Sequence, residues 1–267
     1  MKTKNLSDHD IDEVKEFLDN HPNSKRTMSK DTTQTNLKEF KNNISVSKFK
    51  SKTANQSAII KSIIDKNTTI TIVHGKPGTG KTFSAIQGAL KEFKTGTYTK
   101  LYLTKSVKTL DNKSEDIGFL KGDLEEKIKP FLFSYDFNFK QIINPSTYDA
   151  AREAQLIEFL PLAYIRGIGL NNCVIILDEA QNVNNSILRT VLSRIGKNCK
   201  LIILGDTQQK DSSNGQSSGL DFLIKHFQDI KGFTVIEMTR EDQSRAQIIN
   251  HIEDRYDSLE KEGKRVI

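Results

Sequence analysis

The sequence has few cysteines and no long apolar run, and these absences exclude several classes of protein. Its two cysteines, Cys173 and Cys199, each open an apolar run, which favours buried free thiols over a disulfide or a metal site. No stretch reaches the roughly 18 apolar residues that cross a bilayer, and the chain starts with polar residues rather than an apolar signal region. We therefore expect a soluble, cytoplasmic protein that does not bind membranes.

The chain is also short of acidic residues near its start. Residues 20–61 contain nine lysines and arginines but only Asp31 and Glu39, so this segment has a formal charge of +7. Residues 1–53 are rich in Lys, Asn, Ser and Thr, with one helix-like patch at 11–18, and predict a weakly ordered basic arm. Two interpretations stay open: the arm follows a nucleic-acid backbone, or its charge is ordinary solvated surface.

From residue 54 onward, short runs rich in Ile, Val and Leu alternate with longer helix-like segments. The runs predicted to be strands are 70–74, 100–104, 174–177, 201–204 and 234–238. They are nearly continuously apolar, as strands buried on both faces of a parallel sheet are. These features predict one three-layer α/β domain over residues 54–267, with a mainly parallel sheet. Apolar residues from 248 to 259 recur at helical spacing and predict a last helix that packs on the domain.

Residues 75–82, the phosphate loop, fit the pattern G-x-x-x-x-G-K-[ST] between a predicted strand and a predicted helix. The glycines let successive N–H groups face an anion, together with the positive end of the helix. Lys81 is expected to neutralise the β- and γ-phosphates of a nucleotide, and the Thr82 hydroxyl to bind Mg²⁺. The competing interpretation is an ordinary glycine turn. The predicted nucleotide-binding residues are Gly75, Lys76, Pro77, Gly78, Thr79, Gly80, Lys81 and Thr82.

Polar side chains follow the next two buried runs at the same predicted edge of the sheet. Asp178 and Glu179 end the run 174–177, in the arrangement called Walker B. We expect Asp178 to hold Mg²⁺ through its water shell and Glu179 to orient and deprotonate an attacking water. After the run 201–204, Gln208 is placed to sense a γ-phosphate, although a capping turn is the alternative interpretation.

These three motifs, in this order, resemble the ATPase core of superfamily 1 helicases. Further segments are similar to the PhoH-like family of P-loop ATPases over residues 53–256, namely 118–131, 161–167, 177–182, 193–196 and 218–220. The resemblance implies a RecA-like domain that hydrolyses ATP, occurs in bacteria and their phages, and lies in the host cytoplasm if a phage encodes it. It also implies a homo-oligomeric ring, possibly a hexamer, acting on RNA or single-stranded DNA.

The resemblance also implies roles for single residues. Gln56 would read the adenine edge with its amide, although a solvated glutamine is equally consistent with its place in the sequence. An arginine from a neighbouring subunit would stabilise the transition state, and the candidates are Arg194, Arg240 and, third, Arg166. Arg194 ranks first because Glu241, an acid where the family usually has His, follows Arg240.

The loop after the second predicted strand faces nucleic acid in the related motors. By similarity, Thr104, Lys105, Ser106 and Val107 would contact the strand, and their polar groups suit phosphate oxygens. The alternative is an ATP-driven scaffold or regulator of protein partners, with the basic arm as a docking tail. A small-molecule kinase is disfavoured because Glu179 stands at the water position. Helicase activity is left open, and no second carboxylate cluster supports a nuclease.

Overall fold

The computed structural model describes residues 30–45, 50–96, 98–106, 124–207, 218–244 and 247–262. The helix-like patch 11–18, Val107 and Gln208 lie outside these residues, so their predictions stay predictions. Within the described residues, no helix is both long enough and apolar enough to cross a membrane.

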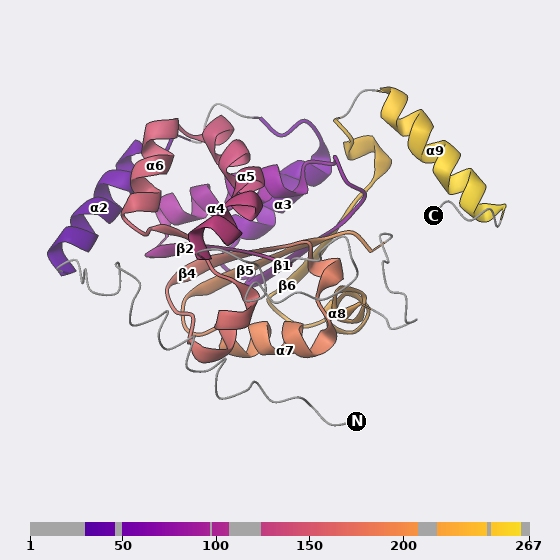
Figure 1. The fold of residues 1–267 in the computed structure, drawn as a ribbon. Helices are drawn as coiled ribbons and strands as arrows, with labels where there is room; N and C mark the ends of the chain where they lie inside the picture. The colour runs from indigo at the N-terminus through magenta and orange to yellow at the C-terminus, as the bar shows by residue number, and fades with distance from the viewer. Residues whose placement is uncertain are drawn as a thin grey trace.

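A six-stranded sheet forms the centre of the fold, in the order β3-β2-β4-β5-β1-β6 (Figure 1). Every pair of neighbouring strands is parallel, which confirms the predicted sheet type. Five strands match the predicted runs, whereas β3 was missed because it is short and contains a glutamate. The strands are β1 (Ile70–Gly75), β2 (Lys100–Lys105), β3 (Ile157–Phe159), β4 (Cys173–Asp178), β5 (Cys199–Gly205) and β6 (Phe233–Met238).

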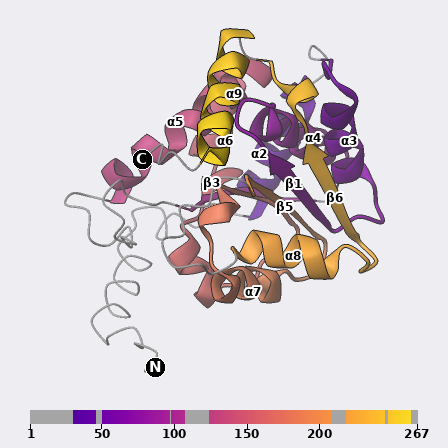
Figure 2. The same ribbon diagram turned by 90° about the vertical axis from the view of Figure 1, so that its right-hand side faces the viewer.

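Helices cover both faces of the sheet, so the fold is the predicted three-layer α/β class (Figures 1 and 2). One face carries α2 (Lys30–Asn43), α3 (Ala54–Ile64), α4 (Lys81–Thr95), α5 (Leu124–Ile142) and α6 (Pro145–Glu153). The other carries η2 (Leu162–Gly167), α7 (Asn185–Arg194) and α8 (Gly219–Phe227). Two short turns, η3 (Ala180–Asn182) and η4 (Arg240–Asp242), follow β4 and β6, and α9 (Gln247–Lys261) comes last.

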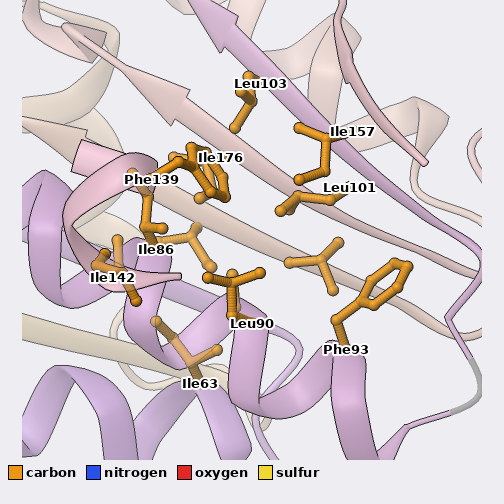
Figure 3. Packing of buried hydrophobic residues seen from close by; sticks show 14 of the residues in the cluster. Ile63, Ile86, Leu90, Phe93, Leu101, Leu103, Phe139, Ile142, Ile157 and Ile176 are labelled. Atoms are coloured by element: carbon orange, nitrogen blue, oxygen red, sulfur yellow. The ribbon is translucent and has the colours of Figure 1, made fainter. Parts of the chain in front are cut away.

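Alternate residues of each central strand enter two separate cores. In β4, Val174 and Ile176 face the α3 and α4 side, whereas Ile175 and Leu177 face the α7 and α8 side. Figure 3 shows the first core, where Ile176 and side chains of α3, α4 and α5 meet. Burial on both faces explains why the central strand sequences are nearly continuously apolar.

The predicted start of the domain at residue 54 is too late, because α2 belongs to the core. Phe40 is 5% exposed, Ile44 is fully buried, and the Phe40 ring packs edge-on against Phe93 of α4 at 5.5 Å between centroids. The Lys41 ammonium donates to the Gly96 carbonyl at 2.9 Å, and Lys94 donates to the Ile44 carbonyl at 2.7 Å. The lysine-rich composition therefore concealed an apolar stripe on this helix.

The last helix forms as predicted, but its apolar face does not pack on the domain. Ile248, Ile252 and Tyr256 of α9 are 59%, 45% and 51% exposed. Figure 1 shows α9 standing apart from the layers, and an ion pair from Arg240 to Asp254 joins the helix to η4. The predicted helix is therefore confirmed, whereas the predicted packing of its apolar face on the domain is wrong.

The two cysteines open β4 and β5, where they are direct neighbours in the register. Both are buried free thiols, with their sulfur atoms 3.4 Å apart. The Cys199 thiol also donates to the Leu170 carbonyl at 2.9 Å. They lie at the amino-terminal edge of the sheet, which is the edge away from the phosphate loop.

Truncating a core side chain of α2 tests its place in the domain. We expect Phe40→Ala to lower the free energy of unfolding by about 3–5 kcal/mol, because it leaves a cavity against α4. The matched control is Phe133→Ala in α5, whose side chain is 73% exposed and whose loss should change stability by about 0.5 kcal/mol at most. Urea unfolding followed by circular dichroism measures both variants. Equal small losses of unfolding free energy would contradict the packing of α2 against α4.

Candidate nucleotide-binding site

The phosphate loop curls between β1 and α4 with its glycines in the conformation that the pattern requires. Gly75, Gly78 and Gly80 have φ angles of 139°, 80° and 82°, a region that other residues rarely adopt. Gly75 also lies against β6, because an added Cβ would sit 2.2 Å from the Met238 carbonyl oxygen. Substitution at Gly75 would therefore cause both backbone strain and a steric clash.

The loop is held closed by its own side chains. The Lys81 ammonium donates to the carbonyl oxygens of Gly75 and Lys76 at 2.5 and 2.8 Å. The Thr79 hydroxyl donates to the Lys76 carbonyl at 2.9 Å, and Thr79 is fully buried. The ammonium thus sits inside the curve of the loop, next to the N-terminus of α4, where an anion is favoured.

Asp178 and the phosphate loop meet across the sheet. The Thr82 hydroxyl, in the first turn of α4, donates to Asp178 Oδ2 at 3.0 Å. Asp178 is buried, and this burial, followed by the nearby charge of Glu179, raises the pKa of its carboxyl group, an effect partly offset by Lys105. A hydroxyl and a desolvated carboxylate are oxygen donors of the kind that Mg²⁺ prefers, so these residues fit the predicted metal.

Glu179 is held in an uncommon backbone conformation at the end of β4. Its φ of 54° is left-handed, which costs a residue other than glycine about 1–3 kcal/mol. Its N–H donates to Asp178 Oδ1 at 2.9 Å, and its side chain is 40% exposed. Oε2 accepts a hydrogen bond from the Gln181 amide at 2.7 Å, and Oε1 lies 3.8 Å from the Lys105 ammonium. The strained turn therefore presents this carboxylate at the carboxyl edge of the sheet.

Gln181 is a site residue that sequence reasoning missed. Its Nε2 binds Glu179, while its Oε1 accepts from the Asp206 N–H at 3.0 Å, so one amide joins the ends of β4 and β5. Gly205 permits this approach, because an added Cβ would lie 3.0 Å from Gln181 Oε1. The signal in the sequence was a glutamine two residues after the predicted base.

Gln56 lies against the phosphate loop, and its amide is engaged within the protein. Its Nε2 donates to the Thr79 carbonyl at 3.1 Å, and its Oε1 accepts from the Lys52 N–H at 2.9 Å. It is 7% exposed. In this structure Gln56 positions the loop, so reading an adenine edge would require its amide to exchange partners.

The segment before α3 is tied to the segment after β6. Thr53 and Asn55 donate to the two carboxylate oxygens of Asp242 at 2.5 and 2.9 Å. The Ser244 N–H donates to the Gly78 carbonyl at 3.3 Å. These hydrogen bonds hold both segments beside the phosphate loop.

The candidate arginines lie at different edges of the sheet. Arg194 ends α7 next to the strand starts, because its carbonyl accepts from the Leu170 N–H at 3.0 Å. A six-residue strand is about 20 Å long, so Arg194 is too far to act on a nucleotide bound to its own chain. Arg240 follows β6 at the edge of the phosphate loop and forms an ion pair with Asp254 of α9. Arg166 is exposed on η2.

The predicted nucleic-acid contacts lie at the end of β2. Thr104 is fully buried and its carbonyl accepts from the Tyr135 hydroxyl at 3.1 Å, so its side chain offers no contact surface in this conformation. Lys105 and Ser106 are partly exposed, and the Ser106 N–H donates to the Asp178 carbonyl at 3.2 Å. The predicted contact stays a prediction for these two residues.

Comparison with known proteins identifies the family. Residues 48–257 match the family described as PhoH-like protein. The chain belongs to the PhoH-like family. It is 34% identical to a PhoH-like protein of Mycobacterium bovis over 212 residues, 79% of this chain and 59% of that protein. It is 35% identical to a PhoH-like protein of Bacillus subtilis over 183 residues, 68% of this chain and 56% of that protein.

This PhoH-like chain thus spans less than two thirds of the length of those curated relatives. Among solved structures, it is similar to the large terminase of a thermophilic bacteriophage in complex with ADP. That likeness has a TM-score of 0.41 and 14% identity, and covers 76% of this chain and 49% of the terminase chain. The family match includes the phosphate loop and both acids.

Removing the buried charge of Asp178 is expected to stabilise the nucleotide-free protein. Burial raises the pKa of this carboxyl group, so its ionised form lowers stability at neutral pH. We expect Asp178→Asn to raise the melting temperature at pH 7 in chelator. The gain should largely vanish by about pH 3, well below the ordinary Asp pKa of about 3.9, where the carboxyl group is mostly protonated in both the folded and the unfolded state.

The matched control for this measurement is Asp229→Asn, which removes an exposed carboxylate. It should leave the melting temperature at pH 7 within error of wild type, because its charge is solvated in both states. A melting temperature that falls at pH 7 for Asp178→Asn would contradict the account of a desolvated carboxylate.

Proposed function

We propose that this PhoH-like chain hydrolyses ATP at the carboxyl edge of its sheet. The observation that carries the proposal is the meeting of the phosphate loop with two acids, made by the hydrogen bond from Thr82 to Asp178. The loop offers backbone N–H groups and a lysine to phosphates. Glu179, directly after Asp178, supplies the second acid that transfer to water requires.

When a nucleotide binds, its phosphates replace the hydrogen-bond partners of the Lys81 ammonium. In the structure its ammonium donates to two neutral carbonyl oxygens, those of Gly75 and Lys76. The β- and γ-phosphate oxygens are charged acceptors and form stronger hydrogen bonds with an ammonium. Lys81 therefore leaves the loop carbonyls for the phosphates.

The hydrolytic step uses the two acids in different roles. Thr82 and Asp178 would hold Mg²⁺, which would neutralise negative charge on the phosphates. Glu179 orients a water molecule and accepts its proton while the water oxygen bonds to the γ-phosphorus and the bond to the ADP oxygen breaks. Gln181 keeps the Glu179 carboxylate in place through its 2.7 Å hydrogen bond. The products are ADP and inorganic phosphate.

We further propose that ATP turnover responds to RNA or single-stranded DNA. Two observations support this: Lys105 and Ser106 are partly exposed, and they lie beside Asp178 at the catalytic edge. A phosphate backbone bound there would be within one strand spacing of the acids, about 5 Å. The competing proposal, a regulator of protein partners, is favoured by the exposed apolar face of α9. In that case protein partners, and not nucleic acid, would change turnover.

A ring of identical subunits completes the proposed site. Arg194 is exposed at the sheet edge opposite the phosphate loop, so the only nucleotide it can reach belongs to a neighbouring subunit. A guanidinium placed there would stabilise charge that develops on the transferred phosphoryl group. A closed head-to-tail ring, such as a hexamer, gives every site such a neighbour.

Two substitutions separate nucleotide binding from hydrolysis. We expect Lys81→Ala to weaken ATP binding at least tenfold, because it removes the ammonium that faces the phosphates. Glu179→Gln should leave binding nearly unchanged and lower kcat by about 10²–10⁴-fold, since it removes the general base. Equilibrium binding of a fluorescent ATP analogue and steady-state phosphate release measure the two effects. Normal turnover by Glu179→Gln would show that Glu179 is not the general base.

Mixing two inactive variants tests whether subunits share a site. Arg194→Ala subunits keep an intact base, and Glu179→Gln subunits keep the arginine, so a mixed ring contains complete sites at some interfaces. We expect phosphate release to reappear on mixing, with a maximum near equal amounts of the two variants. Mixtures that stay as inactive as their components would contradict a site shared through Arg194.

A further inference from the structure

The end of β2 is attached directly to the catalytic acids. Lys105, the last residue of β2, is the register partner of Asp178 in β4. The Ser106 N–H donates to the Asp178 carbonyl at 3.2 Å, which continues the strand pairing past Lys105. The position of the Lys105 backbone is therefore fixed relative to the acids, and only its side chain is left to move.

The Lys105 side chain faces the proposed general base. Its ammonium lies 3.8 Å from Glu179 Oε1, while the other oxygen of this carboxylate binds Gln181. Both oxygens of Glu179 therefore face protein groups, one on β2 and one on η3. In this state the carboxylate is turned towards β2.

In the ion pair between Lys105 and Glu179, the lysine can exchange the glutamate for another anion. The Lys105 and Glu179 side chains are 21% and 40% exposed, so a polyanion can reach the ammonium. Partly exposed ion pairs are weak, and a nucleic-acid phosphate offers the ammonium an anionic partner of equal charge. Because one anion replaces another, the exchange leaves the lysine paired and the glutamate released.

We propose that Lys105 is a positioning residue that holds the Glu179 carboxylate towards β2 and releases it when a nucleic-acid phosphate takes the Lys105 ammonium. This inference rests on the proposed ATPase function and names its regulation. The released carboxylate turns to the water beside the γ-phosphate, with Gln181 still bound to its other oxygen. Binding of nucleic acid is thereby coupled to hydrolysis through one side chain.

The test measures ATP turnover of full-length Lys105→Gln with and without oligo(U) and single-stranded DNA at low salt. We expect kcat without nucleic acid to rise by up to about fivefold at unchanged KM, which corresponds to about 1 kcal/mol at 1.36 kcal/mol per tenfold. Addition of either nucleic acid should then raise turnover no further. Lys105→Arg, which restores the charge, should rescue the response to nucleic acid.

The matched control is Lys100→Gln at the other end of β2, which also removes a lysine paired with a glutamate, Glu158. Its ATP turnover without nucleic acid and the change in turnover on adding nucleic acid should both match those of the wild type. A uniform loss of surface charge would instead affect both lysine variants equally, and that result would overturn a specific role for Lys105.

Two outcomes separate this inference from the proposed function. If Lys105→Gln keeps the wild-type turnover without nucleic acid and only binds oligonucleotide more weakly, Lys105 is a simple contact and the inference is overturned. If neither nucleic acid binds wild type or changes its turnover, the proposed response to nucleic acid fails, and the release step fails with it. The turnover of Lys105→Gln without nucleic acid still decides whether Lys105 restrains Glu179.

Discussion

The hydrogen bond from Thr82 to Asp178 joins the two halves of the site, and the other contacts are arranged around it. β5 lies between β1 and β4, so these strands are about 10 Å apart. The phosphate loop and the first turn of α4 span this gap and bring a hydroxyl to within 3.0 Å of a buried carboxylate. The loop, the helix N-terminus and the acid can act together because the sheet holds both strand ends at one edge.

Further contacts extend from this hydrogen bond along the same edge. Gln181 connects Glu179 to the end of β5, and Lys105 connects it to β2. Gln56 of α3 supports the phosphate loop through its hydrogen bond to the Thr79 carbonyl. The ends of four neighbouring strands, β2, β4, β5 and β1, thus each contribute a group to the edge where we propose that hydrolysis occurs. A phosphate bound at any of them changes the electrostatic field at the others.

The sequence predicted the parts of this site that depend on a local pattern. The glycine turn, its lysine and the two acids after a buried strand follow from their motif patterns, and the parallel sheet follows from the nearly continuous apolar runs. The contacts that Gln181 and Lys105 make were not predicted. Lys105 meets Glu179 because the register aligns β2 with β4, and Gln181 reaches the Asp206 N–H because β5 lies beside β4. The lysines of α2 made its sequence look polar, so its buried face was not predicted. The exposed face of α9 shows that helical spacing predicts a helix but does not identify what the helix packs against.

Hydrolysis at this edge requires that the γ-phosphoryl group pass to a water molecule activated there. The most direct measurement is mass spectrometry of the products after incubation with Mg·ATP in water enriched in ¹⁸O. Transfer to water yields inorganic phosphate with one solvent-derived ¹⁸O atom for each ATP consumed, and ADP without label. Absence of phosphate release, or label in ADP instead of phosphate, would contradict it.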